Sequence, residues 1–134
     1  MSNVVVSIRP CDVKSVSYKN EFRAKPGEKI NIQVKTNVAV KLAPEHPQNA
    51  AVLVRFEAAD QATGIELIIE TITALTSNTF VDDFEGLIKD EYLNTIVLAA
   101  NEKIRTVATN VGLNVTTPAM NFGNKDNVVE FKQN

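Results

Sequence analysis

The sequence predicts an α+β fold in which a four-stranded antiparallel sheet, arranged as a meander, is crossed on one face by a long C-terminal helix. Residues 30–42 alternate apolar and polar side chains, which is the period of a strand with one buried face. Residues 90–111 repeat apolar side chains at spacings of three and four, the period of one helix face. The 134 residues provide one core and not two, so we expect a single domain over residues 1–134.

The first strand region combines two extended pieces. Residues 4–9 are rich in valine and end at Pro10, a residue that stops or bulges a strand. In the piece that follows, Val16, Tyr18 and Phe22 share one face. Residues 25–28 read Lys-Pro-Gly-Glu and predict a turn, because proline presets one central position and glycine permits positive φ at the next.

Three further segments, residues 30–42, 50–59 and 65–76, are predicted to form the rest of the sheet. Residues 30–42 are expected to point alternate aliphatic side chains into the core, and residues 50–59 to do the same with Val52, Val54 and Phe56. In residues 30–42, the side chains expected to point inward are those of Ile30, Ile32, Val34, Thr36, Val38, Val40 and Leu42.

Residues 65–76 form the last predicted strand, and they carry aliphatic side chains on both faces. Leu67 and Ile69 lie on one face, and Ile68 and Ile72 on the other. A strand with two apolar faces is usually covered on both sides, and this chain has one helix to offer. We therefore favour a partner subunit over the second face, with a bulge that turns Ile72 into the same core as the alternative.

The connector and the helix carry recognisable end signals. Asp82 and Glu85 have the spacing of a capping box for a short helix. Asp90 is a suitable N-cap for the long helix, and Gly112 is placed to adopt the left-handed conformation just after its end. At about 1.5 Å per residue, the roughly 22 helical residues span about 33 Å, enough to cross a small sheet. Residues 123–134 are mostly polar and are expected to form a loose tail.

Few residues in this sequence could carry out catalysis. Cys11 and His46 are the single cysteine and histidine, which excludes a histidine cluster for a metal within one chain. Asp82, Asp83 and Glu85 could bind a hard cation or act as an acid–base pair, but caps of a helix start explain them better. We therefore expect no enzyme activity, no metal and no cofactor. A net charge of −2 with scattered basic residues counts against nucleic acid as a partner. The start of the chain has no signal-peptide pattern, and no stretch is apolar enough for a membrane span, so we expect a cytoplasmic protein.

The order of these elements resembles that of the export chaperone SecB and its relatives, over about residues 12–122. The resemblance rests on three motifs. Because each of them is short, their order and placement along the chain support the resemblance more than any single motif does. They are Lys14-Ser15-Val16-Ser17-Tyr18, similar to the family's Lys-Asp-Ile-Ser-Phe; Arg105 and Val107 before the helix-ending Gly112; and Leu113-Asn114-Val115, Pro118 and Asn121-Phe122, similar to the family's Leu-Asn-Leu, proline and Asn-Phe.

The sequence also departs from this family. The aromatic-proline insert after the helix-ending glycine is missing, and Thr95-Ile96-Val97-Leu98 replaces a proline and cysteines. The charge is nearly balanced, and Val129-Glu130-Phe131-Lys132-Gln133-Asn134 stands where the family has a long acidic extension. Family members bind the translocation ATPase SecA through acidic surface and tail, so these departures count against SecA as a partner. A SecB-like protein of a toxin–antitoxin system or of a phage fits at least as well as one in protein export.

The resemblance implies an ATP-independent holdase, a homotetramer built as a dimer of dimers, whose hydrophobic grooves bind unfolded or precursor polypeptide. A dedicated binding module for one antitoxin-type or phage protein, and a carrier of a small apolar ligand, are the alternatives. For the aromatic residues, anchoring of the connector in the core is as good an explanation as contact with a client. The candidate groove residues are Phe80, Phe84, Leu87 and Tyr92, followed by Ile32, Val34 and Val38.

Overall fold

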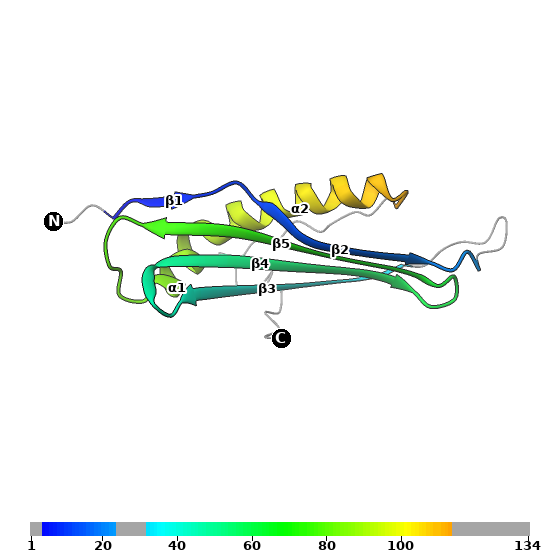
Figure 1. Cartoon of the computed structure of the whole chain (residues 1–134), viewed down its shortest axis with the longest axis horizontal. Helices are drawn as coiled ribbons and strands as arrows, with labels where there is room; N and C mark the ends of the chain where they lie inside the picture. Colours follow the sequence, from blue (N-terminus) through cyan, green and yellow to red (C-terminus); the bar gives the residue numbers. More distant parts are fainter. Residues whose placement is uncertain (1–3, 24–31, 114–134) are drawn as a thin grey trace.

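A computed structural model describes residues 4–23 and 32–113 of the chain, and shows one antiparallel sheet with helices on one side (Figure 1). The predicted α+β class is confirmed. After the last strand and a short connector come three helical segments without a break between them, and the second is a π-helix. The elements are β1 (Val6–Ile8), β2 (Asp12–Asn20), β3 (Gln33–Ala43), β4 (His46–Asp60), β5 (Ile65–Ser77), α1 (Phe84–Leu87), η1 (Ile88–Tyr92) and α2 (Leu93–Asn110).

The sheet contains five strands where the sequence analysis predicted four. β3, β4 and β5 form the expected meander, but β1 and β2 pair with β5 and not with β3. The two follow each other along one edge of β5: β1 pairs with its last residues and β2 with the rest (Figure 1). Pro10, which cannot donate a ladder hydrogen bond, lies between them and explains the break. The chain therefore passes from one edge of the sheet to the other between β2 and β3.

The predicted short helix is present, but its cap and that of the long helix differ from the prediction. Asp83 is the N-cap of α1, and its Oδ1 accepts a hydrogen bond from the Gly86 backbone N–H at 3.1 Å. Asp82, the predicted cap, does not play this role, and Asp90 lies inside η1 instead of capping the long helix. The prediction failed because aspartate is a suitable N-cap residue at any of these positions, and the backbone conformation decides which one caps a helix.

The end of α2 agrees with the sequence. Gly112 has φ +86°, its N–H donates to the Thr109 carbonyl at 3.0 Å, and the Leu113 N–H donates to the Ala108 carbonyl at 2.8 Å. This pair of bonds is a Schellman motif, in which a left-handed residue closes the last helical turn. The predicted role of Gly112 is confirmed.

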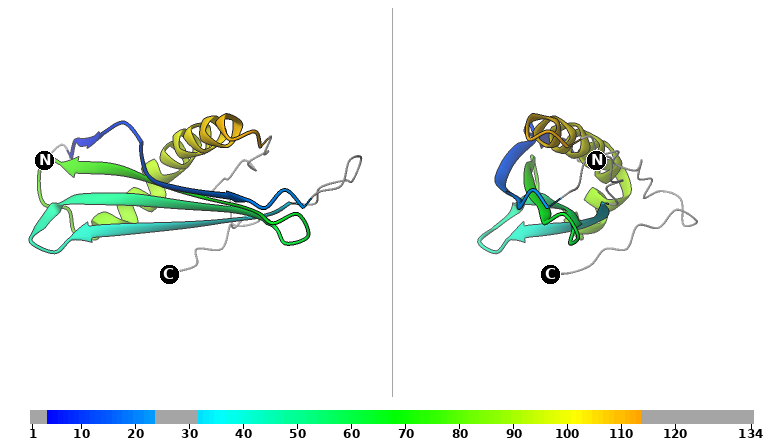
Figure 2. Two further views of the ribbon diagram at one scale, coloured as in Figure 1. Left: turned by 45° about the vertical axis from the view of Figure 1, so that its right-hand side comes forward. Right: turned by 90° about the vertical axis from the view of Figure 1, so that its right-hand side faces the viewer.

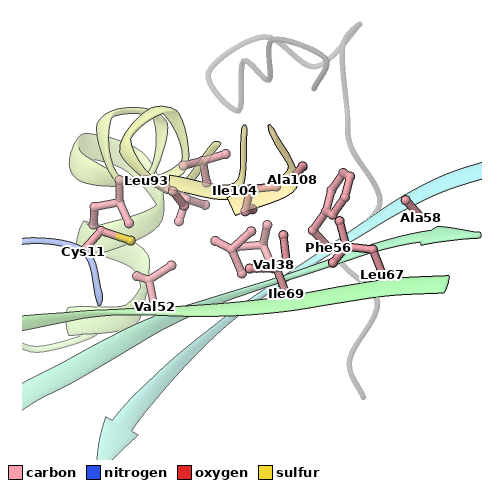
Figure 3. Close-up of a cluster of buried hydrophobic side chains, with 14 of the residues drawn as sticks. Cys11, Val38, Val52, Phe56, Ala58, Leu67, Ile69, Leu93, Ile104 and Ala108 are labelled. Carbon is pink, nitrogen blue, oxygen red and sulfur yellow. The ribbon is translucent and has the colours of Figure 1, made fainter. Parts of the chain in front are cut away.

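The core lies between α2 and the face of the sheet that it crosses (Figures 2 and 3). Val52, Val54 and Phe56 of β4 are buried there, as predicted, together with every second residue of β5 from Ile65. The helix adds a stripe of buried residues at spacings of three and four. That stripe consists of Leu93, Ile96, Val97, Ala100, Asn101, Ile104 and Ala108.

Residues 30–42 were expected to bury one face along their whole length, and this prediction holds only near the middle. Val38 is buried, whereas Val34 and Leu42 are exposed. β3 is an edge strand, paired only with β4 among the strands that the structure describes, so its ends lie beyond the cover of the helix. An alternating pattern indicates a face but does not indicate how far the covering element reaches.

The face of the sheet opposite the helices is partly apolar. Ile68 and Ile72 of β5 lie there, as the sequence predicted, and the structure shows that they are half-buried. The alternative of a bulge at Ile72 is wrong, because β5 pairs with β4 without a register shift and Ile72 lies opposite Leu53. The one irregularity on β5 comes from β2, between Val13 and Ser15. A partner subunit over this face stays a prediction.

Several sequence predictions concern residues outside the described ranges. These are the turn at 25–28, the start of the strand predicted over residues 30–42, the motif from Asn114 to Phe122 and the tail at 123–134. In residues 4–23 and 32–113, none of the helices combines the length and the hydropathy that crossing a membrane requires.

Candidate functional site

The seven candidate groove residues do not come together on one surface. Phe84 and Val38 are part of the buried core and have almost no contact with solvent. Phe84 is the first residue of α1, and its burial fixes the start of the helical region against the sheet. The anchoring explanation therefore accounts for Phe84 without any contact with a client.

Three other candidates are half-buried at the edge of the core. Leu87 precedes η1, Tyr92 ends it and Ile32 precedes β3, and all three pack against the buried cluster. Each leaves only part of its side chain to solvent, so each could form the floor of a groove but not its exposed rim. Their contact with a client stays a prediction.

The remaining two candidates are exposed. Phe80, in the connector after β5, has 64% of its surface accessible, and Val34 on β3 has 40%. Both are large apolar side chains in water, which makes them available for contact with another molecule. Phe80 and Val34 come from different parts of the fold. The sequence did not indicate that only these two of the seven candidate groove residues would be exposed.

A second set of exposed apolar side chains lies on β2, and we call Val13, Val16 and Tyr18 the β2 strip. They are 37–45% exposed and point to the same face of the sheet as the core, because they pair with Thr71, Ile69 and Leu67, which are buried beneath the helix face. The sequence indicated part of this face through the alternation of Val16 and Tyr18. It did not indicate that the helix would leave this edge uncovered.

The backbone of β2 adds to this surface. Among the strands that the structure describes, β2 pairs with β5 alone, so its outer N–H and C=O groups form an edge of the sheet. An extended peptide can add to such an edge through main-chain hydrogen bonds and place alternate side chains on one face. The β2 strip lies on that face, beside the available backbone groups.

The groups that could support catalysis lie apart or have structural roles. The Cys11 thiol is buried in the core, whereas His46 is exposed at the start of β4. Asp83 caps α1, and Glu85 pairs with Lys89 at 3.5 Å, one turn along the helix. Within the described parts of the chain, no three histidine, cysteine or carboxylate side chains gather in a way that could hold a metal ion.

Comparison with known proteins gives a match in structure and none in sequence. No family model matches the chain, and no curated protein is similar to it in sequence. Among solved structures, the chain is similar to the Mycobacterium tuberculosis SecB-like chaperone Rv1957, determined in complex with a ChAD peptide from the HigA1 antitoxin. The TM-score is 0.65 at 16% identity, over 87% of this chain and 91% of that chain.

The chain has a SecB-like fold. At 16% identity the similarity concerns the fold alone, and the roles of individual side chains must come from this chain. Large apolar side chains are exposed on several parts of this SecB-like fold, and the β2 strip contributes three of them on one edge of the sheet. The others in the described residues are Val4, Val5, Ile8, Phe22, Val34, Leu42, Phe80 and Leu98.

Proposed function

We propose that this protein is a chaperone-type binding protein that holds extended, unfolded polypeptide on the β2 strip without using ATP. The exposed apolar side chains of Val13, Val16 and Tyr18, beside a sheet edge, are the observation that carries the proposal. The SecB-like structural neighbour holds an antitoxin peptide, and this supports a role in binding polypeptide.

The physical basis is burial of apolar surface combined with main-chain pairing. A strand added to β2 would place alternate side chains against Val16 and Tyr18, since residues two apart in a strand share a face. Such contacts contribute roughly 25 cal/mol per Å² of apolar surface buried, less the cost of ordering the peptide. Main-chain hydrogen bonds do not depend on side-chain identity, so many different clients would bind weakly.

Assembly of several copies belongs to the same proposal. A single strip gives weak binding, whereas several strips on one oligomer bind a long client by raising the effective concentration of the next site. We expect a tetramer in light scattering coupled to size-exclusion chromatography. We expect no dependence on the ATPase SecA, because the nearly balanced charge of −2 offers little acidic surface.

The test is suppression of aggregation when a slow-folding, urea-denatured protein is diluted into buffer without nucleotide. Light scattering should fall as this protein is added and should reach a plateau near one tetramer per client. Val16→Asp should weaken the suppression, because it introduces a charge into the β2 strip. Ser17→Asp is the matched control, since the neighbouring residue of the same strand points to the opposite face.

Equal suppression by the Val16→Asp and Ser17→Asp proteins would show that the β2 strip does not hold the client. No suppression at large excess of the wild-type protein would overturn the holdase function altogether. Phe80→Asp separates the two surfaces: loss of suppression in this variant alone would move the site to the connector.

A dedicated partner is the second candidate, because the structural neighbour was solved with a peptide from an antitoxin. This alternative predicts one tight complex in place of many weak ones. Titration of several unrelated unfolded proteins and peptides distinguishes the two: similar affinities across the set support a general holdase. One affinity that exceeds the others by about a hundredfold or more, near 3 kcal/mol, would support a dedicated partner.

A further inference from the structure

The sheet face opposite the helices contains a polar hollow of about 420 Å³ that extends across four strands. Side chains of β2, β3, β4 and β5 line it, and four of them are cationic while two are carboxylates. The hollow therefore has a net charge of +2 in a protein whose total charge is −2. Its lining is Lys14, Lys35, Asn37, Val38, Ala39, Lys41, Leu53, Arg55, Glu57 and Glu70.

Both carboxylates in the hollow pair with the same guanidinium, that of Arg55. Arg55 Nε lies 2.8 Å from Glu57 Oε1, and Arg55 Nη1 lies 3.4 Å from Glu70 Oε2. Ser15 Oγ donates a hydrogen bond to Glu70 Oε1 at 2.8 Å. This bond, followed by the charge of Arg55, lowers the pKa of Glu70 despite partial burial of its carboxyl. Arg55 and the two carboxylates together leave one negative charge, whereas the hollow has three lysines, so its excess positive charge comes from the lysines.

Two of those lysines lie on the same face of β3. Lys35 and Lys41 are exposed, and neither forms an ion pair with another residue in the part of the chain that the structure describes. At about 3.3 Å per residue, their Cα atoms are roughly 20 Å apart along the strand. A ligand that contacts both must therefore be an extended chain with negative charge at two separate places.

Between these lysines lies a buried amide with an unused acceptor. Asn37 is only 5% exposed, and its Oδ1 has no hydrogen-bond partner among the described residues. A buried acceptor without a partner lowers stability, and such groups in a folded protein call for an explanation. A ligand N–H that reaches the hollow would supply the missing donor.

We propose that this hollow, which we call the β3 hollow, binds an acidic stretch of extended polypeptide. Its carboxylates pair with Lys35 and Lys41, and a backbone or side-chain N–H donates to Asn37 Oδ1. A phosphate chain supplies the charges but has no N–H along its backbone, and a small carboxylate cannot reach both lysines. The β3 hollow is on the opposite face from the β2 strip, so this proposal does not rest on the proposed function.

The experiment measures fluorescence anisotropy of a labelled twelve-residue peptide of alternating glutamate and serine, titrated with the full-length protein at low salt. The matched probe has glutamine in place of glutamate. We expect saturable binding of the acidic peptide, at least tenfold weaker binding of the glutamine peptide, and weakening as salt is raised. Equal binding of the two peptides, or no binding of the acidic one, would overturn the proposal.

Charge reversal locates the site. Lys41→Glu should weaken binding about fivefold, the size expected for exposed ion pairs. Lys103→Glu is the matched control, because Lys103 is an exposed lysine on α2, outside the hollow, and the change in net charge is the same. Similar losses in both variants would mean that the peptide senses overall charge and that the β3 hollow is not its site.

Asn37→Ala tests the buried amide with two measurements. Affinity for the acidic peptide should fall about threefold, while the thermal midpoint should stay unchanged or rise, because the acceptor lacks a partner in the free protein. A lower midpoint with unchanged affinity would assign Asn37 a structural role and remove it from the site.

Two further measurements test whether something other than an acidic peptide occupies the β3 hollow. Competition by a single-stranded oligonucleotide that is sensitive to Lys41→Glu would show a general anion site and overturn the assignment to acidic polypeptide. Loss of peptide binding as the protein concentration rises would show that a second copy of the chain occupies this face instead. Val16→Asp should leave acidic-peptide binding unchanged, so failure of the β2 strip as a client site would not affect this result.

Discussion

Gly64→Ala tests how firmly the β2 end of the sheet is held. Gly64 precedes β5 and has φ +73°, a conformation that residues with a side chain rarely adopt. An added Cβ would lie 2.6 Å from Glu21 Cβ and 2.9 Å from Glu21 Cγ. The Gly64 carbonyl accepts a hydrogen bond from the Glu21 N–H at 3.1 Å, so the alanine would displace the segment that this bond holds.

The expected loss of stability has two parts. Left-handed backbone costs an alanine about 1–2 kcal/mol. Displacement of Glu21 removes one or two backbone hydrogen bonds, each contributing about 1 kcal/mol. The stiffer unfolded chain offsets about 0.4–1 kcal/mol of this. We therefore expect the free energy of unfolding to fall by about 2–3 kcal/mol.

Gly112→Ala is the matched control, because Gly112 also has positive φ, at +86°, but no atom lies within 4 Å of an added Cβ. Only the backbone part applies there, so we expect a loss of about 1 kcal/mol. Urea unfolding followed by circular dichroism measures both values. Equal losses, or a larger loss for Gly112→Ala, would refute the steric reasoning about Glu21. Because residues 21–23 follow the β2 strip, Gly64→Ala should also weaken suppression of aggregation.

Three further outcomes follow from single side chains. Asp83→Ala should lower stability by about 1 kcal/mol or more in urea unfolding, because it removes the cap of α1, whereas Asp82→Ala should change it little. Thr73→Val should raise stability by about 1 kcal/mol, because the buried Thr73 hydroxyl has no hydrogen-bond partner in the described structure. Thr71→Val is the control and should lower stability slightly, because it removes the 3.5 Å hydrogen bond from the Thr71 hydroxyl to the Val54 carbonyl. Folding lowers the pKa of Glu70 below the ordinary glutamate value of 4.5, so the ionised carboxylate stabilises the folded protein above that pH. This stability is lost as the pH falls through the lower pKa of the folded state. Glu70→Gln should therefore make the stability of the protein depend less on pH in the acid range, as measured by urea unfolding at several pH values.

Local patterns in the sequence were sufficient to predict the class of the fold. The apolar spacing along residues 90–111 indicated the long helix, and the alternation of Val52, Val54 and Phe56 indicated a half-buried strand. Gly112 could be placed at the helix end because few residues adopt positive φ without strain. Each of these inferences depends on neighbours in sequence, and the structure confirms each of them.

Long-range pairing could not be predicted in this way. The sequence indicated that residues 12–20 were extended, but not that they would pair with β5 on the far side from β3. Pairing partners are chosen by which edge is free after the meander forms, and that depends on residues more than 40 positions away. The count of five strands follows from the same choice.

The candidate site shows most clearly what the tertiary structure decided. A large apolar side chain such as Phe84 or Val16 is equally suited to a core and to a binding surface, so composition cannot separate the two. Packing of the helices over β3, β4 and β5 buried Phe84 and Val38 and left Val13, Val16 and Tyr18 exposed. The sequence by itself determined which residues are apolar and which faces they share. Only the fold determined which of those faces the helix covers, because burial depends on the position of a separate element.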